Sequence, residues 1–476
     1  MPTGCCVPIC NIPEWMNGNY FMNGPGKFET GDFKVNHLFD GYAMIVKFDI
    51  KPDAVKFQSR FIQSDAFKKF TNHGKPVFQE FGTPGAADPD RNAFGRFVSK
   101  FVPLELTDNV CANFQVIGNE LYASSETNFL WLINQDTLET IEKERMCVVA
   151  TLILHQDGTI YNAGSSFGAV MKYNVFKVDP PDNTDKNSNS DSESLERKGY
   201  RKGEVLFTIS SKWSTCYGYY HSFGMTENYF ILIEQCLTAN IPKLVVSQMK
   251  GKAIKDCLEW IPNENVKYLA EPFFVLHHIN AFEEGDDIVV DLVAYNTAQI
   301  LDNLFLDKLK KSDFDLCEGP QIRRYVLPVN VEKVEPSTTN LIKFECDATA
   351  VLKKQKQSLD LIYLGLIMKN TTAKNTNLSM DVVKWVQMSS ITHLKKVWVG
   401  PSENKFLEPI FVKNPNGDAE DDGLLLFLGI SLKENTNHLL MILDAKQMKE
   451  VARVDIPSTI FLPFAFHGCY IPRNRN

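Results

Sequence analysis

The runs LLLFLGISL, residues 424–432, and HLLMILDA, residues 438–445, follow one another closely near the C-terminal end of the chain. Each run is short and almost continuously apolar, and the residues between them, KENTN, are polar. Short apolar runs bounded by turn residues are typical of strands, whereas surface helices repeat their apolar residues every three or four positions. We therefore expect both runs to be β-strands.

The same pattern recurs through most of the sequence. Further examples are YAMIVKFDI (42–50), TIYNAGSSFGAVMKYNVFKV (159–178), YFILIEQC (229–236) and DIVVDLVAY (287–295). Gly, Asn and Asp separate these runs, and strong helical periodicity is scarce, so the sequence predicts a large all-β protein: a sandwich, a barrel or a propeller. The 476 residues are compatible with several domains or with one repeat-built domain.

Composition excludes some classes of partner and compartment. The net charge is -8 and the lysines and arginines are scattered, which disfavours nucleic-acid binding. No uninterrupted apolar run approaches about 18 residues, and the first 15 residues lack the features of a secretion signal. Eleven cysteines, an odd number without paired spacing, are typical of a reducing compartment. We expect a soluble, cytoplasmic protein.

Two segments depart from the strand pattern. Between residues 91 and 102, the side chains of Phe94, Phe97, Val98 and Phe101 fall on one face of a predicted helix. Such a face either caps the core, which the residues alone favour, or docks on a bilayer surface. The polar stretch at about 180–203 predicts a long exposed loop.

The segment Gly164 to Gly168, GSSFG, matches the G-x-S-x-G motif of serine hydrolases, with Ser166 as nucleophile. That motif requires a strand, a sharp turn and then a helix. Here the following residues, AVMKYNVFKV, continue as a strand, so the sequence predicts a β-turn without a hydrolase function.

Four of the nine histidines lie in or beside strand-like runs: His155, His221, His277 and His467. A metal site assembled from separate strands needs no local spacing of its ligands, and imidazole suits iron, zinc or copper. The alternative is a buried histidine bonded to a backbone carbonyl, which is the commoner case. His277 and His278 are neighbours in a strand and face opposite ways, and periodicity does not say which of them joins a site.

Nine segments occur in order from Ile12 to Pro472: IPEWMNGNYFMNGPGKF, NHLFDGYAMI, ELTDNV, ASSETNF, YYHSFGMTENY, HHINAFEE, LEPIFV, EDDG and FHGCYIP. Together they resemble the animal carotenoid cleavage oxygenases. That family includes the central and eccentric β-carotene cleaving enzymes and the retinoid isomerase of the retinal pigment epithelium.

The resemblance implies a single domain over residues 1–476, a seven-bladed β-propeller with a helical cap on one face. It also implies four histidines that coordinate an Fe(2+) ion on the propeller axis. Matched by motif, three ligands are His221, His277 and His467. The fourth falls on ATLILHQDG (150–158), where only His155 is available and lies closer to the turn than the ligand of the family does.

Members of the family orient these histidines through glutamates, which accept the second imidazole N–H. Glu126 in ASSETNF and Glu408 in LEPIFV match two of them. The third belongs to a region that reads VLKKQKQSLDLIYLG here, with no glutamate and with Asp360 as the only acidic substitute.

By resemblance, the expected reaction is addition of O2 across one polyene double bond of a carotenoid or apocarotenoid, with slight preference for central cleavage of a substrate such as β-carotene to retinal. The alternatives are eccentric (9',10') cleavage, a retinoid isomerohydrolase, and a degenerate carotenoid-binding protein without activity. A water-insoluble substrate also implies peripheral contact with a membrane or lipid droplet, for which the resemblance favours the Phe94–Phe101 face.

Overall fold

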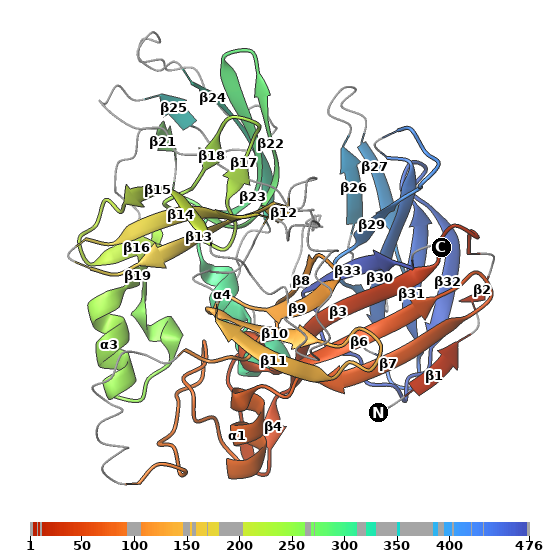
Figure 1. The fold of residues 1–476 in the computed structure, drawn as a ribbon, viewed down its shortest axis with the longest axis horizontal. Coiled ribbons are helices and arrows are strands. Elements are labelled where there is room, and N and C mark those ends of the chain that lie inside the picture. Colours follow the sequence, from red (N-terminus) through yellow and green to blue (C-terminus); the bar gives the residue numbers. More distant parts are fainter. Residues whose placement is uncertain are drawn as a thin grey trace, which may run out of the picture.

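Strands dominate the computed structural model. It describes residues 3–6, 8–9, 12–92, 106–145, 153–154, 159–168, 170–179, 203–261, 268–270, 272–311, 320–329, 350–352, 384–388, 395–401, 404–419, 421–431 and 433–473. Within these ranges the strands form ten sheets, and every strand pair is antiparallel. A mostly β fold with few helices is therefore confirmed (Figure 1).

Two large sheets contain both ends of the chain. The first has the order β1 (Thr3–Cys6), β7 (Val55–Phe61), β6 (Tyr42–Ile50), β3 (Gly18–Lys27) and β33 (His467–Pro472). The second has the order β2 (Pro8–Ile9), β32 (Lys449–Ile456), β31 (His438–Asp444), β30 (Gly423–Ser431) and β28 (Asn404–Phe406), and β29 (Ile410–Lys413) also pairs with β30.

The middle of the chain forms smaller sheets. Two sheets have four strands: one has the order β11 (Thr140–Arg145), β10 (Phe129–Ile133), β9 (Glu120–Ser124) and β8 (Asn113–Ile117), and the other β12 (Ile153–Leu154), β13 (Ile160–Ser166), β14 (Lys172–Val178) and β15 (Glu204–Ser210). Two sheets have three strands: one has the order β16 (Cys216–Gly218), β19 (Leu237–Asn240) and β20 (Leu258–Trp260), and the other β22 (Phe274–Glu284), β23 (Asp287–Tyr295) and β24 (Gln321–Pro328). The remaining strands form pairs: β4 (Glu29–Thr30) with β5 (Phe33–Lys34), β17 (Gly224–Met225) with β18 (Phe230–Ile231), β21 (Tyr268–Ala270) with β25 (Ala350–Leu352), and β26 (Lys384–Met388) with β27 (Lys395–Val399).

The helices are short. They are α1 (Asp65–His73), α3 (Ile241–Met249), α4 (Gln299–Asn303), α5 (Leu306–Lys311) and the 3-10 turns η1 (Leu38–Asp40) and η2 (Ile254–Cys257). None of the helices in the described ranges combines the length and the apolar character needed to cross a bilayer.

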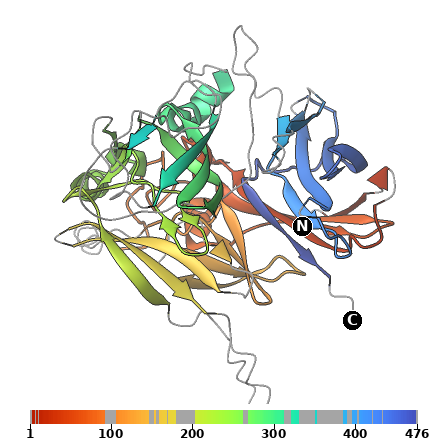
Figure 2. The same ribbon diagram turned by 90° about the horizontal axis from the view of Figure 1, so that it is seen from above.

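Strand β6 shows why the sheets stack. All its residues are buried except Asp49, so the strand is covered on both faces. Val46 and Phe48 belong to a core shared with β30, β31 and β32, whereas Ala43 and Ile45 belong to a second core shared with β8, β9 and β10. Face-to-face stacking of successive antiparallel sheets is the packing expected of neighbouring propeller blades, and both views show the sheets arranged in succession (Figures 1 and 2).

Strand β33 joins the two ends of the chain. It pairs with β3 from Gly18 opposite Pro472 to Asn23 opposite His467. The C-terminal strand thus lies beside β3, a strand from the N-terminal part of the chain (Figure 1), and the first residue of β33, His467, pairs with Asn23.

Most strand predictions are confirmed: the runs at 42–50, 287–295, 424–432 and 438–445 form β6, β23, β30 and β31. The run at 229–236 was predicted as one strand, but only Phe230–Ile231 pairs. The physical reason lies at Gln235, whose side chain bonds the backbone of Tyr219 and of Val275 in place of a strand ladder.

The hydrolase motif forms a hairpin. β13 ends at Ser166, and β14 begins at Lys172, directly opposite it in the ladder. A strand follows where a nucleophile elbow needs a helix, so the β-turn prediction is confirmed. Other predictions lie outside the described residues: His155, Asp360, the face formed by Phe94, Phe97, Val98 and Phe101, and almost all of the loop at 180–203.

Candidate metal centre

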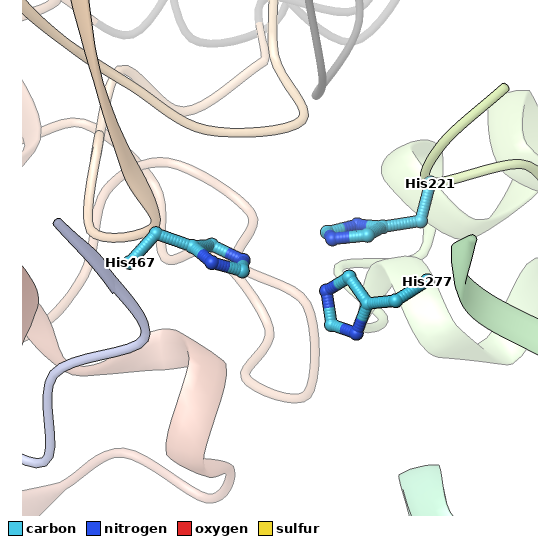
Figure 3. A group of neighbouring side chains, drawn as sticks. All are labelled: His221, His277 and His467. Atoms are coloured by element: carbon cyan, nitrogen blue, oxygen red, sulfur yellow. The ribbon is translucent and has the colours of Figure 1, made fainter. Parts of the chain in front are cut away.

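Three histidines from distant parts of the chain converge (Figure 3). His221 lies in the turn before β17, His277 in β22, and His467 at the start of β33. Each offers one nitrogen, and the three nitrogens lie within 4.8 Å of one another. The ring of His277 stands at 82° to each of the other two, with ring centres 5.0 Å and 5.3 Å away. The three predicted ligands therefore meet around one point.

A bulge in β22 decides between the neighbouring histidines. Val275 pairs with Ala294 and His278 with Leu292, so three residues advance on β22 against two on β23. Bulges of this kind re-aim side chains, often beside functional sites. His277 consequently reaches His221 and His467, whereas His278 is fully buried and bonds the hydroxyl of Ser222 through Nδ1.

Two glutamates form hydrogen bonds with two of the histidines, His221 and His467. Oε1 of Glu126, in the loop between β9 and β10, accepts a hydrogen bond from Nδ1 of His221. Oε1 of Glu408, between β28 and β29, lies 2.9 Å from Nδ1 of His467. A carboxylate on Nδ1 fixes the tautomer and ring angle of an imidazole, which assigns metal binding to Nε2.

Tyr219 is a residue that the sequence reasoning missed. Its hydroxyl donates to the same Oε1 of Glu126 that His221 bonds. Burial, and then the charge of Glu126, raise the pKa of Tyr219 well above its ordinary value, so the phenol stays protonated as a donor. The segment YYHSFG contained the signal, since Tyr219 lies two residues before the ligand, but nothing in the segment itself shows that the two share a carboxylate.

His277 differs from the other two histidines. Its Nε2 is buried, and no described residue forms a hydrogen bond with it. Burial, followed by the neighbouring charges of His221 and His467, lowers the pKa of His277 well below its ordinary value. The imidazole of His277 is therefore neutral and retains a lone pair that the described protein does not use.

Glu408 has the opposite influence on His467. Burial by itself lowers the pKa of this histidine, but the charge and the hydrogen bond of Glu408 outweigh burial and raise the pKa. The carboxylate thereby stabilises positive charge on this imidazole, whether the charge comes from a proton or from a metal ion.

This donor set fits a transition metal. Three imidazoles from three separate segments, two of them backed by carboxylates, can hold iron, zinc or copper. The Nε2 atoms of His277 and His278 are both buried without a hydrogen-bond partner among the described residues, but only His277 lies beside two other imidazoles. This convergence, together with the unsatisfied Nε2 of His277, is the structural observation that supports the fit.

A second group of potential ligands does not fit as well. His73, Asp88 and Asp90 lie within the same distance limit of one another. Lys69 pairs with both aspartates and Arg91 pairs with Asp88, so cationic side chains already neutralise the group. We interpret it as a surface ion-pair network.

Comparisons with known proteins show which family the chain is similar to. The family model "Retinal pigment epithelial membrane protein" matches residues 3–472. The chain is 32% identical to the "Carotenoid-cleaving dioxygenase, mitochondrial" of Mustela putorius furo, covering 97% of this chain and 92% of the relative. It is 30% identical to the Homo sapiens protein of the same name, covering 97% and 87%.

Solved structures show the same fold. The cobalt-substituted form of Synechocystis ACO superimposes with a TM-score of 0.72 at 18% identity, covering 99% of this chain and 96% of that one. A chimera of the same enzyme with a retinal pigment epithelial protein also has a TM-score of 0.72, at 20% identity and with the same coverage. The match over nearly the whole chain shows that this protein belongs to the carotenoid cleavage oxygenase family and confirms the prediction of an oxygenase enzyme.

Proposed function

We propose that this chain is a dioxygenase that uses Fe(2+) to cleave one double bond of a carotenoid or apocarotenoid. The observation that carries the proposal is the convergence of His221, His277 and His467, two of them held by Glu126 and Glu408. The "Carotenoid-cleaving dioxygenase" relatives support the substrate class. The cobalt-substituted Synechocystis enzyme supports a metal in this fold.

When bound, Fe(2+) supplies the activation of dioxygen. In the overall reaction O2 adds one oxygen atom to each carbon of the double bond, and two carbonyl products form. The protein orients the ligands and holds one double bond of the polyene in the position where it can react. His155 is proposed as the fourth ligand, in its family-matched position.

Aromatic side chains neighbour two of the histidines in the chain. Phe466, which precedes His467, packs edge-on against Phe39, and Phe39 also packs against Phe81, with ring centres 5.4 Å apart in both pairs. Tyr219 packs against Phe274, which belongs to the same strand as His277. We propose that such side chains exclude water from the site and contact the hydrocarbon chain of the substrate.

The remaining parts of the proposal concern architecture and location. We propose a single seven-bladed propeller with a helical cap, supported by the stacked antiparallel sheets and the fold match. Peripheral contact with a membrane or lipid droplet through Phe94, Phe97, Val98 and Phe101 would supply the water-insoluble substrate. The compartment is proposed as cytoplasmic, against the mitochondrial names of the relatives.

The test combines metal content, oxygen uptake and product length. Purified protein reconstituted with Fe(2+) should consume one O2 for each β-carotene cleaved. Two molecules of retinal per substrate indicate central cleavage, the preferred outcome, and one long and one short aldehyde or ketone indicate eccentric cleavage. Isomerised retinoid without O2 uptake would instead identify an isomerohydrolase, and carotenoid bound without stoichiometric iron would identify a degenerate binding protein.

A further inference from the structure

The structure has a cavity whose lining does not include any of the three histidines. Its volume is about 870 Å3, within the range of roughly 300–1,000 Å3 of small-molecule sites. It is formed at the ends of β3, β6 and β7 and by α5, and none of its lining residues belongs to the metal centre. Its wall is largely apolar and includes Phe28, Met44, Phe61, Leu306 and Phe461.

Three lysines border this cavity in a chain whose net charge is negative. Lys27, Lys34 and Lys310 surround Glu29, which forms an ion pair with Lys34 at 2.9 Å. The hydrogen bond and charge of Lys34, and then the charges of Lys310 and Lys27, lower the pKa of Glu29. Among the described residues, no carboxylate lies within ion-pair distance of Lys27 or Lys310. One carboxylate therefore faces three ammonium groups, and the fourth cation of the lining, Arg60, forms an ion pair with Glu139 at 3.2 Å.

One aromatic ring of the cavity wall is open to solvent. Phe461 is 54% exposed although it is aromatic. An exposed ring is a feature of a wall that contacts a ligand and not only the core.

We propose that this cavity binds a long-chain carboxylate, with the apolar chain against Phe28, Met44, Phe61 and Phe461 and the carboxylate among Lys27, Lys34 and Lys310. The excess of cations selects an anion, and the apolar wall selects a long chain over a small ion. The site is independent of the metal centre, so the inference does not rest on the proposed oxygenase reaction.

The experiment is titration calorimetry with laurate, compared with dodecanol, which lacks the charge, and with hexanoate, which lacks the length. Wild-type protein should bind one laurate, and each comparison compound should bind at least about tenfold more weakly. The triple variant K27Q/K34Q/K310Q should lose about tenfold or more in laurate affinity, since it removes the three cations that face the carboxylate. The control K56Q/K433Q/K449Q, at exposed positions elsewhere, should bind like the wild type.

Three further variants sharpen the assignment. Glu29→Gln removes the competing carboxylate and should strengthen laurate binding by a few-fold. Phe461→Ser should weaken laurate binding but not hexanoate binding, and because Phe461 is exposed the variant should fold normally. His277→Ala should leave laurate binding unchanged, since it alters only the metal centre.

Several outcomes would overturn the proposal. Equal affinity for laurate and dodecanol would exclude recognition of the anion. Unchanged binding by K27Q/K34Q/K310Q would place laurate elsewhere, for example in the substrate site. Lysine-dependent recruitment to phosphatidylserine vesicles without binding of monomeric laurate would identify a membrane contact instead.

Discussion

Two histidines, the fully buried His37 and the half-buried His277, illustrate opposite uses of an imidazole. His37 is fully buried, its Nε2 bonds the carbonyl of Leu301 at 2.8 Å, and its Nδ1 accepts a hydrogen bond from the backbone of Phe39 at 3.1 Å. The Nε2 of His277 is buried without a hydrogen-bond partner among the described residues. A histidine bonded on both nitrogens stabilises the fold, whereas the unbonded Nε2 of His277, which lies beside two other imidazoles, is available to a ligand.

The surroundings of the two histidines repeat this contrast. Beside His37, both oxygens of Asp40 accept hydrogen bonds, from the amides of Gly82 and His37 and from the hydroxyl of Thr83. Nearby Asp108 caps the first turn of α1 through the amides of Asp65 and Ala66. Asp40 comes from the segment NHLFDG and Asp108 from ELTDNV, so part of the sequence that resembles the family builds the scaffold and not the metal centre.

The largest expected effect comes from removing a convergent histidine. His277→Ala should abolish stoichiometric iron and lower activity by more than about 100-fold, beyond the range for loss of an orienting partner. In the metal-free protein the substitution should cost no hydrogen bond, because the Nε2 of His277 has no hydrogen-bond partner among the described residues. Iron content by mass spectrometry and oxygen uptake measure the effect. If His277→Ala bound iron and remained active, His277 would not be a metal ligand.

Removing the carboxylate of Asp40, beside His37, should lower the stability of the protein but not its affinity for iron. Asp40→Ala leaves three buried donors without an acceptor and should lower the free energy of unfolding by about 3 kcal/mol or more. Chemical denaturation of the metal-free protein measures this loss, with Asp53→Ala at an exposed position as control. The folded fraction of Asp40→Ala should still bind iron. If the variant kept the stability of the wild type but lost iron, the surroundings of His37 would serve the metal centre and not the fold.

The orienting glutamates should have an intermediate effect. Glu408→Gln replaces an acceptor of the His467 ring proton by an amide and should weaken metal affinity by about 10- to 100-fold. Competition with a chelator measures the affinity. Glu450→Gln, on the surface and paired with Arg453, is the matched control. Equal metal affinity in Glu408→Gln and wild type would show that Glu408 does not orient the ligand.

The scaffold cluster also predicts how stability changes with pH. Burial, opposed by hydrogen bonds from Gly82 and Thr83, raises the pKa of Asp40 to about 6, so the folded state binds more protons than the unfolded state between about pH 4 and 6. This contribution to stability falls as pH rises. Burial lowers the pKa of His37 to about 4, so the unfolded state binds more protons between about pH 4 and 6.5, and this contribution rises with pH.

The two contributions oppose each other in the wild type. Asp40→Asn should therefore give a stability that rises more steeply with pH, and His37→Gln one that falls, each by up to about 1.4 kcal/mol per pH unit. Glu80, whose pKa burial raises, and Lys255 and Asp302, whose charges act on His37, stay in both variants. The measurement is urea denaturation of the metal-free protein between about pH 4 and 6.5. If the stability of both variants changed with pH in the same way, Asp40 and His37 would not make opposing contributions.

The smallest effect is expected at the residue next to a ligand. Burial lowers the pKa of His278 to about 3, and its Nδ1 bonds the Ser222 hydroxyl on the face away from the other histidines. His278→Gln should cost about 1 kcal/mol of stability and leave iron content unchanged. Iron loss in this variant, measured beside His277→Ala, would show that the wrong neighbour was assigned.

Much of the molecule could be predicted from sequence. Apolar runs such as LLLFLGISL determined the strands, because a strand buried on both faces needs continuous apolar residues. The strand pattern that follows GSSFG was enough to argue against a hydrolase, because a nucleophile elbow needs a helix at that point. The matched motifs identified His221, His277, His467, Glu126 and Glu408, and these residues do converge.

Only the tertiary structure decided how these residues work together. A two-residue strand period places His277 and His278 on opposite faces without choosing between them, and the choice comes from a bulge that depends on pairing with β23. Likewise, Tyr219 shares Glu126 with His221 across more than ninety residues of sequence, and Gln235 replaces a strand ladder. Such contacts arise from long-range antiparallel pairing, which leaves no fixed spacing in the sequence.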